Sequence, residues 1–168
     1  PAASRSPRLS RSYPLSFFAR PTVNLAHPAN TKVLAYLARG RSGSPVHSAW
    51  DSVENPYYRC GCHPEIVERL WEQLGAALPS DCRCLVHLTP ALVQPRSGVI
   101  LATGLGTQYG VRVPAALVSA ALTAGAKTQT TWSGGKTMDI QQDLGADWVF
   151  GGWRTDELAW CRSLYETF

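Results

Sequence analysis

The chain has 168 residues, of which 45% are hydrophobic and 17% are charged, and its formal net charge is +4. The length favours one domain with an extension over two domains, and such a domain can bury a core without disulfides or a metal. No apolar run approaches the roughly 20 residues that cross a bilayer, and no secretory signal is evident, which predicts a soluble or peripheral protein.

Charge is divided unevenly along the chain. Residues 1–50 hold seven of the 16 Lys and Arg residues and none of the 12 Asp and Glu residues, so their net charge is +7 and that of residues 51–168 is −3. A basic segment without acids suits an acidic partner surface or nucleic acid, and an Arg- and Ser-rich composition is also typical of organelle-targeting peptides. A solvated tail without a partner is the alternative.

Residues 1–29 are predicted to form an extended arm, because Pro7, Pro14 and Pro21 interrupt a stretch rich in Ser and Arg. Such an arm cannot bury enough apolar surface to fold alone, so we expect it to take its order from a neighbour. The side chains of the arm that we expect to contact a partner are Arg5, Arg8, Arg11, Tyr13, Phe17, Phe18 and Arg20.

Residues 30–48 are predicted to form a short helix followed by a linker. Asn30 suits the N-cap of a helix over residues 30–39. The apolar stripe of this helix would be Val33, Leu34 and Leu37. The Gly- and Ser-rich residues that follow favour a flexible linker, so we place the boundary of the folded domain near Ser48.

A helix is predicted over residues 64–74, since its apolar side chains recur on one face. Strands are expected next. The alternation of residues 83–89 and 108–113 predicts strands with one buried face, whereas the continuous apolar run of residues 99–103 predicts a strand buried on both faces. Pro90 is expected to break or edge the first of these strands.

The C-terminal third alternates between short helices and short strands. The pattern predicts helices over 115–124 and 156–166, a helical turn within 138–144, and strands over 128–132 and 147–150. Together the elements predict an α+β fold: an antiparallel three- to five-stranded sheet with helices packed on one face, plus the extended N-terminal arm. The folded domain is assigned to residues 49–168.

Four cysteines form two Cys-x-Cys pairs, Cys60/Cys62 and Cys82/Cys84, with His87 near the second pair. Four thiolates suit zinc, but side chains two residues apart on a strand are separated by roughly 7 Å, too far for one tetrahedral ion without a kink. Disulfides are a second alternative, and reduced, packed cysteines are the interpretation that we favour. The sequence therefore predicts no cofactor, with these four cysteines as the remaining metal candidates.

Two glycine-rich segments come close to phosphate-binding motifs without matching them. Residues 133–137 (Ser-Gly-Gly-Lys-Thr) lack the earlier glycine of a P-loop, and residues 104–110 miss the dinucleotide-binding spacing by one residue. Both are interpreted as turns, although the Gly-Gly-Lys-Thr loop is able to hold a single anion. Because the chain has neither a nucleophile elbow nor a His-Glu-x-x-His motif, the sequence leans against an enzyme.

Six tryptophans are many for a chain of this length. Packing accounts for Trp71, Trp148 and Trp160. Trp50 and Trp153 lie in linker and turn contexts, so they are the tryptophans that we expect to contact a partner.

These observations predict a non-catalytic accessory subunit of a larger multiprotein assembly that docks through its basic N-terminal arm. The favoured setting is an organellar complex in a mitochondrion or chloroplast, and the bacterial cytoplasm is the alternative. Two other functions stay open. One is an RNA-binding protein of a ribonucleoprotein particle that uses the Arg-rich arm, and the other is a small metal-binding protein or enzyme built on the paired cysteines and His87.

Overall fold

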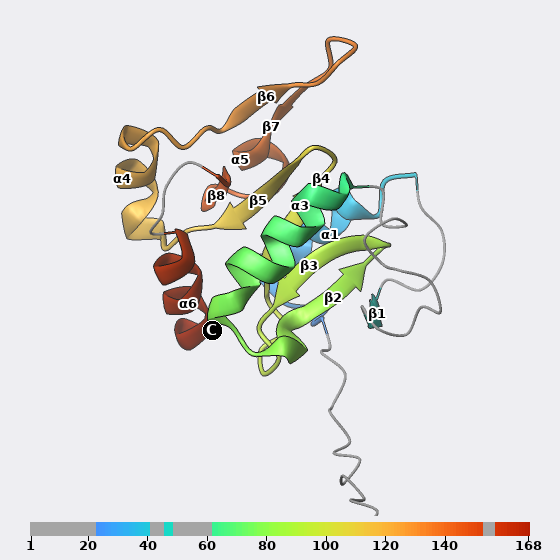
Figure 1. Cartoon of the computed structure of the whole chain (residues 1–168), viewed down its shortest axis with the longest axis vertical. Coiled ribbons are helices and arrows are strands. Elements are labelled where there is room, and N and C mark those ends of the chain that lie inside the picture. The colour runs from blue at the N-terminus through green and yellow to red at the C-terminus, as the bar shows by residue number, and fades with distance from the viewer. Residues whose placement is uncertain (1–22, 41–45, 49–61, 153–156) are drawn as a thin grey trace, which may run out of the picture.

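A computed structural model of the chain describes residues 23–40, 46–48, 62–152 and 157–168 (Figure 1). Its helices are η1 (Pro28–Asn30), α1 (Thr31–Leu37), α3 (Pro64–Glu68), η2 (Arg69–Gln73), η3 (Leu74–Ala77), η4 (Ser80–Cys82), η5 (Ala115–Leu117), α4 (Val118–Thr123), α5 (Ile140–Asp143) and α6 (Glu157–Thr167). Its strands are β1 (Val46–Ser48), β2 (Arg83–Val86), β3 (Thr89–Val93), β4 (Ile100–Leu105), β5 (Gln108–Arg112), β6 (Gln129–Thr131), β7 (Thr137–Asp139) and β8 (Trp148–Phe150).

One antiparallel sheet forms the centre of the molecule, with its strands in the order β1-β2-β3-β4-β5-β8. Five of these strands lie between residues 83 and 150, and the three-residue β1 extends the sheet at one edge. β6 and β7 pair separately as a hairpin that projects from the body at the top of Figure 1. The predicted α+β class with an antiparallel sheet is confirmed.

The strand predictions agree best with the structure in the middle of the sheet. β4 is buried along its whole length, as its continuous apolar run predicts. Along β5 and just beyond it, Tyr109, Val111 and Val113 all contribute to one core, which is the expected alternation. The continuous apolar run thus identified β4, and the alternation of apolar residues identified β5.

The stretch predicted as one strand over residues 83–89 is instead the first half of a hairpin. After β2 the chain turns at His87 and Leu88, whose φ angles of 46° and 62° are both positive. Pro90 lies inside β3 opposite Leu85, so it does not end or edge the sheet. The favoured two-residue hairpin turn needs positive φ angles at its two central positions, which Asn and Gly usually occupy. Because His and Leu rarely adopt positive φ angles, His87 and Leu88 did not indicate a turn in the sequence.

Residues 64–77 form one helical run in which α3, η2 and η3 follow one another. The predicted helix ended at residue 74, whereas the run continues through Gly75, and its middle section η2 is a π-helix. The apolar face is buried as predicted. The Trp71 side chain is fully buried, and its Nε1–H donates to the carbonyl oxygen of Ala91 at 3.2 Å, which ties the run to β3.

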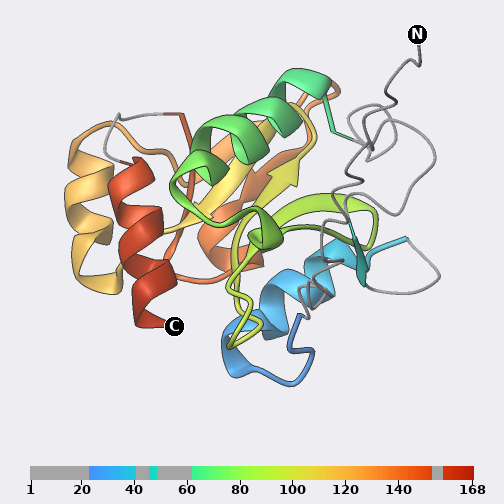
Figure 2. The same ribbon diagram turned by 60° about the horizontal axis from the view of Figure 1, so that its bottom comes forward.

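Helices cover both faces of the sheet, which corrects the prediction that they pack on one face. The first core contains side chains of α3, η2, η3, α4 and α6, and the second contains side chains of α1 and α5. Figure 2 shows α3 and α1 on opposite sides of the sheet. Neighbouring residues of β2 explain this arrangement, because Leu85 enters the first core while Cys84 and Val86 enter the second, so both faces need cover.

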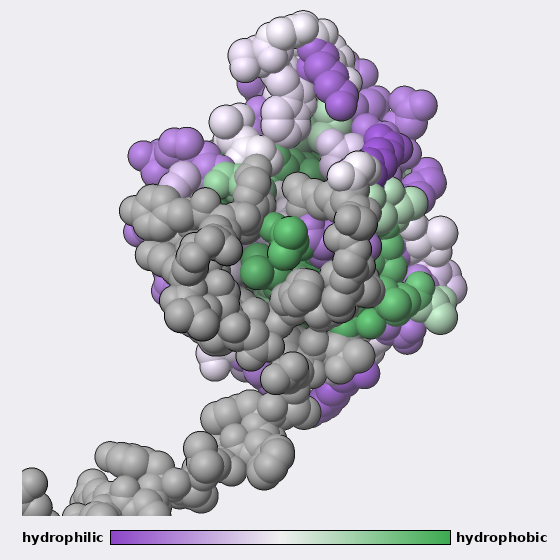
Figure 3. Space-filling view, turned by 90° about the vertical axis from the view of Figure 1, so that its right-hand side faces the viewer, coloured by the Kyte–Doolittle hydropathy of each residue, from purple (hydrophilic) through white to green (hydrophobic). Residues whose placement is uncertain are grey.

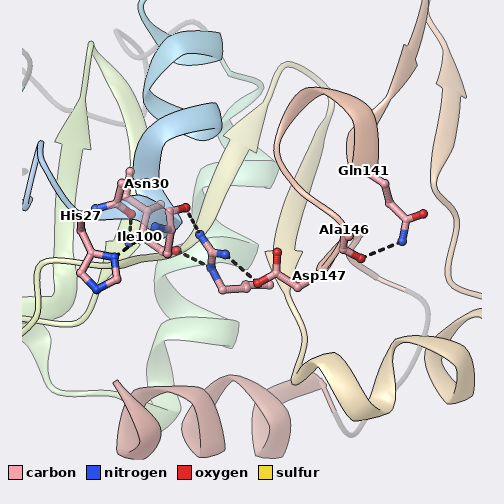
Figure 4. Close-up of polar contacts among 8 residues, drawn as sticks. His27, Asn30, Ile100, Gln141, Ala146 and Asp147 are labelled. Atoms are coloured by element: carbon pink, nitrogen blue, oxygen red, sulfur yellow. Dashed lines mark hydrogen bonds and ion pairs between the residues drawn. The ribbon is translucent and has the colours of Figure 1, made fainter.

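The N-terminal part of the described chain is bonded to the sheet through a buried asparagine. Asn30 precedes α1 but its side chain makes no cap hydrogen bond. Its amide instead donates to the carbonyl oxygen of Gly98 at 2.7 Å. Its Oδ1 accepts from the Ile100 N–H at 2.9 Å, a contact that Figure 4 shows. α1 thus belongs to the folded body, although the sequence placed residues 30–48 before the domain boundary.

Arg112 of β5 lies beside this contact and is almost completely buried. Its Nε donates to the carbonyl oxygen of Ile100 at 3.1 Å, its Nη2 donates to that of Ala29 at 2.8 Å, and its Nη1 pairs with Asp147 at 2.6 Å. We refer to the buried Asn30 and Arg112, together with the half-buried Asp147, as the buried polar cluster. It joins the N-terminal segment, two central strands and the start of β8.

Candidate functional site

A pocket of about 310 Å³ opens between the end of α1, the β4–β5 turn and the β6–β7 hairpin. Among the described residues its lining contains two basic side chains, two aromatic rings and no carboxylate. We therefore call it the cation–aromatic pocket. The residues of its lining that matter for its chemistry are Tyr36, Arg39, Thr89, Gly106, Trp132 and Lys136.

The β6–β7 hairpin brings Trp132 and Lys136 to this pocket. The hairpin loop is closed by two backbone hydrogen bonds, from Trp132 N–H to the Lys136 carbonyl oxygen at 2.8 Å and from Gly135 N–H to the Trp132 carbonyl oxygen at 3.0 Å. Figure 3 shows the side of the molecule that carries β1, with hydrophobic atoms near its centre and the hydrophilic to neutral hairpin above them. The loop thus places one aromatic and one cationic side chain on a shared edge of the pocket.

The ring of Trp132 lies against the backbone of the β4–β5 turn. Gly106 occupies this turn with a φ of 71°, and a Cβ atom at that position would collide with the ring. Glycine is therefore required here twice, once for the positive φ and once for the close approach of the indole. The turn fixes where the aromatic wall of the pocket stands.

Arg39 and Tyr36 form the second cation–aromatic pair of the lining. The guanidinium carbon of Arg39 lies 4.8 Å from the centre of the Tyr36 ring, within the range of a cation–π contact. Arg39 also pairs with Asp143 of α5 at 3.4 Å, but its side chain is 65% exposed. Exposed ion pairs of this kind contribute little free energy, so the guanidinium is available to another anion.

The remaining electrostatics of the pocket favour a neutral phenol beside positive charge. Burial raises the pKa of Tyr36 above its ordinary value, Asp143 adds to this, and Arg39 opposes it. The Tyr36 O–H donates to the sulfur of Met138 at 3.4 Å. Lys136 is exposed, and no carboxylate in the described part of the chain pairs with it. The pocket is therefore built to attract an anion and to contact a flat ring.

A second pocket of about 470 Å³ involves β6, β8 and the segment between α4 and β6. Its basic side chain is Lys127, and Gln108 in its lining already donates to the hydroxyl of Thr130 at 2.7 Å. Polar groups that bond one another are less free to bind a ligand. The cation–aromatic pocket, which holds two basic side chains, is the stronger candidate.

The two glycine-rich segments that the sequence interpreted as turns meet at the cation–aromatic pocket. Positive φ angles at Gly106, Gly134 and Gly135 agree with the turn interpretation. Residues 104–106 line the pocket from the sheet, and Lys136 lines it from the hairpin. Sequence reasoning missed the site because only the tertiary fold brings the two glycine-rich segments together. The presence of Trp132 and Lys136 within one loop was a sequence signal for an aromatic and a basic side chain side by side.

Among the described cysteines, Cys82, Cys84 and Cys161 are free thiols that are divided between the two cores. Cys82 lies in η4 and enters the first core, whereas Cys84 enters the second, so this pair does not share the strand face that its spacing suggested. Burial raises the pKa of Cys82, Cys84 and Cys161 to about 12, which keeps these thiols protonated. Cys62 is half-buried at the cation–aromatic pocket, and Cys60 lies outside the described residues.

No group of three or more His, Cys, Asp or Glu side chains that could hold a metal occurs among the residues that the structure describes. His87, which the sequence grouped with the cysteines, lies in the turn between β2 and β3. The two Cys-x-Cys pairs and His87 are thus not assembled into a site by the described part of the fold.

The side chains predicted to contact a partner all lie outside the described residues. They are Arg5, Arg8, Arg11, Tyr13, Phe17, Phe18, Arg20, Trp50 and Trp153. Of the tryptophans assigned to packing, Trp71 and Trp148 are fully buried and Trp160 packs against the first core. The predicted partner contacts therefore stay predictions.

No protein-family model, curated protein or solved structure matches this chain. Over the ranges that the structure describes, no helix has both the length and the apolar character needed to cross a bilayer. The proposals below rest on the residues of the chain itself.

Proposed function

We propose that this protein is a non-catalytic subunit of a larger multiprotein assembly and that it docks through its basic N-terminal segment. The observation that carries the proposal is the division of charge. Residues 1–50 contain seven of the 16 basic residues and none of the 12 acidic ones, while the rest of the chain has a net negative charge. A segment of this kind has no internal carboxylates to neutralise it, so an acidic partner surface is its natural complement.

The attachment of this segment to the body supports a docking role. Val23 is buried in the second core, and Asn30 is bonded to β4 and to the turn before it. Whatever residues 1–22 bind is therefore linked to the sheet through a short stretch of ordered backbone.

Three buried thiols of the body support a non-catalytic role. Cys82, Cys84 and Cys161 are buried, and with pKa values of about 12 they hold almost no thiolate at neutral pH. Nucleophilic cysteines are the opposite in both respects, because they are accessible to solvent and have a lowered pKa. We place the assembly in a mitochondrion or chloroplast, because the composition of the segment is that of a targeting peptide, with the bacterial cytoplasm as the alternative setting.

The test compares the elution of three tagged full-length chains from extracts of the native host. The first is the wild type, and the second carries Arg5→Gln, Arg8→Gln, Arg11→Gln and Arg20→Gln. The third is a control that removes four exposed basic side chains of the body, through Arg69→Gln, Arg96→Gln, Lys127→Gln and Arg162→Gln.

We expect the wild type and the control to elute well above the monomer position on gel filtration, and the variant with four substitutions in the segment to shift to the monomer position. Removal of the same number of charges in both variants separates a local effect from a change in net charge. A wild type that elutes as a monomer, or a segment variant that elutes with the wild type, would overturn the proposal.

RNA is the second candidate partner, and one observation favours it. Tyr36 and Arg39, which belong to the basic segment, share a pocket with Trp132 and Lys136. Aromatic rings interleaved with basic side chains are the usual platform for single-stranded nucleic acid. Binding of a fluorescent single-stranded RNA at 50 to 300 mM KCl tests this candidate: we expect affinity to fall steeply with log salt concentration, and a flat response would remove it.

A further inference from the structure

The lining of the cation–aromatic pocket is given by described residues, none of which belongs to residues 1–22, so its ligand can be considered independently of the assembly proposal. We propose that this pocket binds one nucleotide unit, with the phosphate held by Lys136 and Arg39 and the base against the aromatic rings. Its volume of about 310 Å³ suits a ligand of this size. The inference extends the RNA candidate but does not rest on docking through the N-terminal segment.

The two basic side chains supply the phosphate half of the site. They come from different parts of the fold, since Arg39 follows α1 and Lys136 comes from the β6–β7 hairpin. The lining contains no carboxylate among the described residues. The ion pair that Arg39 forms with Asp143 in the described part of the chain is long, and the guanidinium of Arg39 is exposed. A phosphate bound here would exchange that weak pair for a bidentate contact to the guanidinium.

The two rings supply the base half of the site. Tyr36 and Trp132 are both half-buried and both line the pocket. The absence of a side chain at Gly106 lets the six-membered ring of the Trp132 indole pack closely against the β4–β5 turn, so the turn supports the ring before any ligand arrives. A fixed aromatic ring loses little conformational entropy when a base stacks on it.

The test is isothermal titration of the purified full chain with adenosine monophosphate, adenosine, inorganic phosphate and hexa-adenylate. If the pocket recognises both halves of a nucleotide, adenosine monophosphate binds at least tenfold more tightly than adenosine or phosphate alone. Equal affinities for adenosine monophosphate and inorganic phosphate would show an anion site without a base contact and would overturn the proposal.

Variants assign any binding to the pocket. Lys136→Gln removes a charge from an exposed hairpin loop, so we expect the fold to be retained and the affinity for adenosine monophosphate to fall at least tenfold. Arg96→Gln is the matched control, because Arg96 is exposed in the turn at the opposite end of β4. Equal affinities of these two variants would also overturn the proposal.

The hexanucleotide distinguishes the two sources of the same chemistry. Tighter binding of hexa-adenylate than of the mononucleotide, lost in Lys136→Gln, identifies an RNA strand as the source, whereas equal binding identifies a free nucleotide. The quadruple Arg→Gln variant of the N-terminal segment should bind adenosine monophosphate like the wild type. The nucleotide proposal can therefore hold even if the assembly experiment fails, and the assembly proposal can hold even if the chain does not bind nucleotides.

Discussion

Arg112 and Arg39 show how the same residue type serves two purposes in one fold. Arg112 is buried, it bonds to two carbonyl oxygens and to Asp147, and it lies over the Trp148 ring at 4.8 Å. Arg39 contacts one ring and one carboxylate and is 65% exposed. In the buried polar cluster, the guanidinium of Arg112 is fully engaged in bonds that hold the fold together. In the cation–aromatic pocket, the guanidinium of Arg39 is available to bind a partner.

The largest effect is expected from removal of the buried guanidinium. Arg112→Met keeps most of the side-chain volume but leaves the Asp147 carboxylate and the carbonyl oxygens of Ile100 and Ala29 without their donor. We expect the free energy of unfolding to fall by about 3–5 kcal/mol, measured by urea denaturation. Arg162→Met, at an exposed position of α6, should cost less than about 0.5 kcal/mol. If Arg112→Met lowers the free energy of unfolding by less than about 1 kcal/mol, the buried polar cluster is not what attaches residues 23–30 to the sheet.

Asn30→Ala tests the other side of the buried polar cluster. The substitution leaves the buried Ile100 N–H without its acceptor, and the Gly98 carbonyl oxygen keeps only its hydrogen bond from the Asn24 N–H among the described residues. We expect a loss of about 2–3 kcal/mol in the same denaturation experiment. Asn24→Ala is the control, because Asn24 is exposed and its side chain accepts only a local hydrogen bond from Ala26. Similar losses for the two variants would contradict the role assigned to Asn30.

Gly106→Ala moves the comparison to the pocket. The new methyl group would collide with Trp132 and would also occupy a backbone with φ of 71°, so we expect a loss of about 1–2 kcal/mol and a shift in tryptophan emission. Gly135→Ala provides the control, since Gly135 has a similar φ of 79° but open space around it. If Gly135→Ala costs as much, the contact with Trp132 does not matter.

A smaller effect is expected from pH at the base of the hairpin. Hydrogen bonds from the backbone N–H of Gln142, the side chain of Gln129 and the backbone N–H of Gln141 hold the pKa of Asp139 below its ordinary value of 3.8. Because the folded-state pKa is lowered, this stabilisation is present above pH 3.8 and is lost as pH falls through the folded-state value. Asp139→Asn should therefore flatten the acid limb of the stability curve slightly. If the acid limb of the stability curve is the same in Asp139→Asn and in the wild type, the lowered pKa of Asp139 does not contribute to stability.

The parts of the fold that the sequence predicted correctly are those where local pattern and final environment agree. β4 is a continuous apolar run and is buried on both faces, and residues 109, 111 and 113 alternate into one core. The helix from residue 64 has its apolar side chains on one face and packs that face on the sheet. In each case the order of apolar side chains along the chain determines which faces of the element must be buried.

The parts that the sequence did not predict depend on tertiary contacts or on rare backbone geometry. His87 and Leu88 form a hairpin turn with positive φ angles that their side chains do not favour. The sequence predicted that Asn30 caps a helix, but its side chain instead bonds to Gly98 and Ile100, which lie about 70 positions away along the chain. The pocket unites α1, the β4–β5 turn and the hairpin, so no local window of sequence contains it.

The most direct test of the account is the Arg39→Gln variant, in which stability and ligand binding are measured on the same protein. We predict that its free energy of unfolding stays within about 0.5 kcal/mol of the wild type, because the exposed pair with Asp143 contributes little. Its affinity for adenosine monophosphate should fall at least tenfold. A variant that binds the nucleotide as the wild type does, or that loses stability on the scale of Arg112→Met, would contradict the division between a structural and an available arginine.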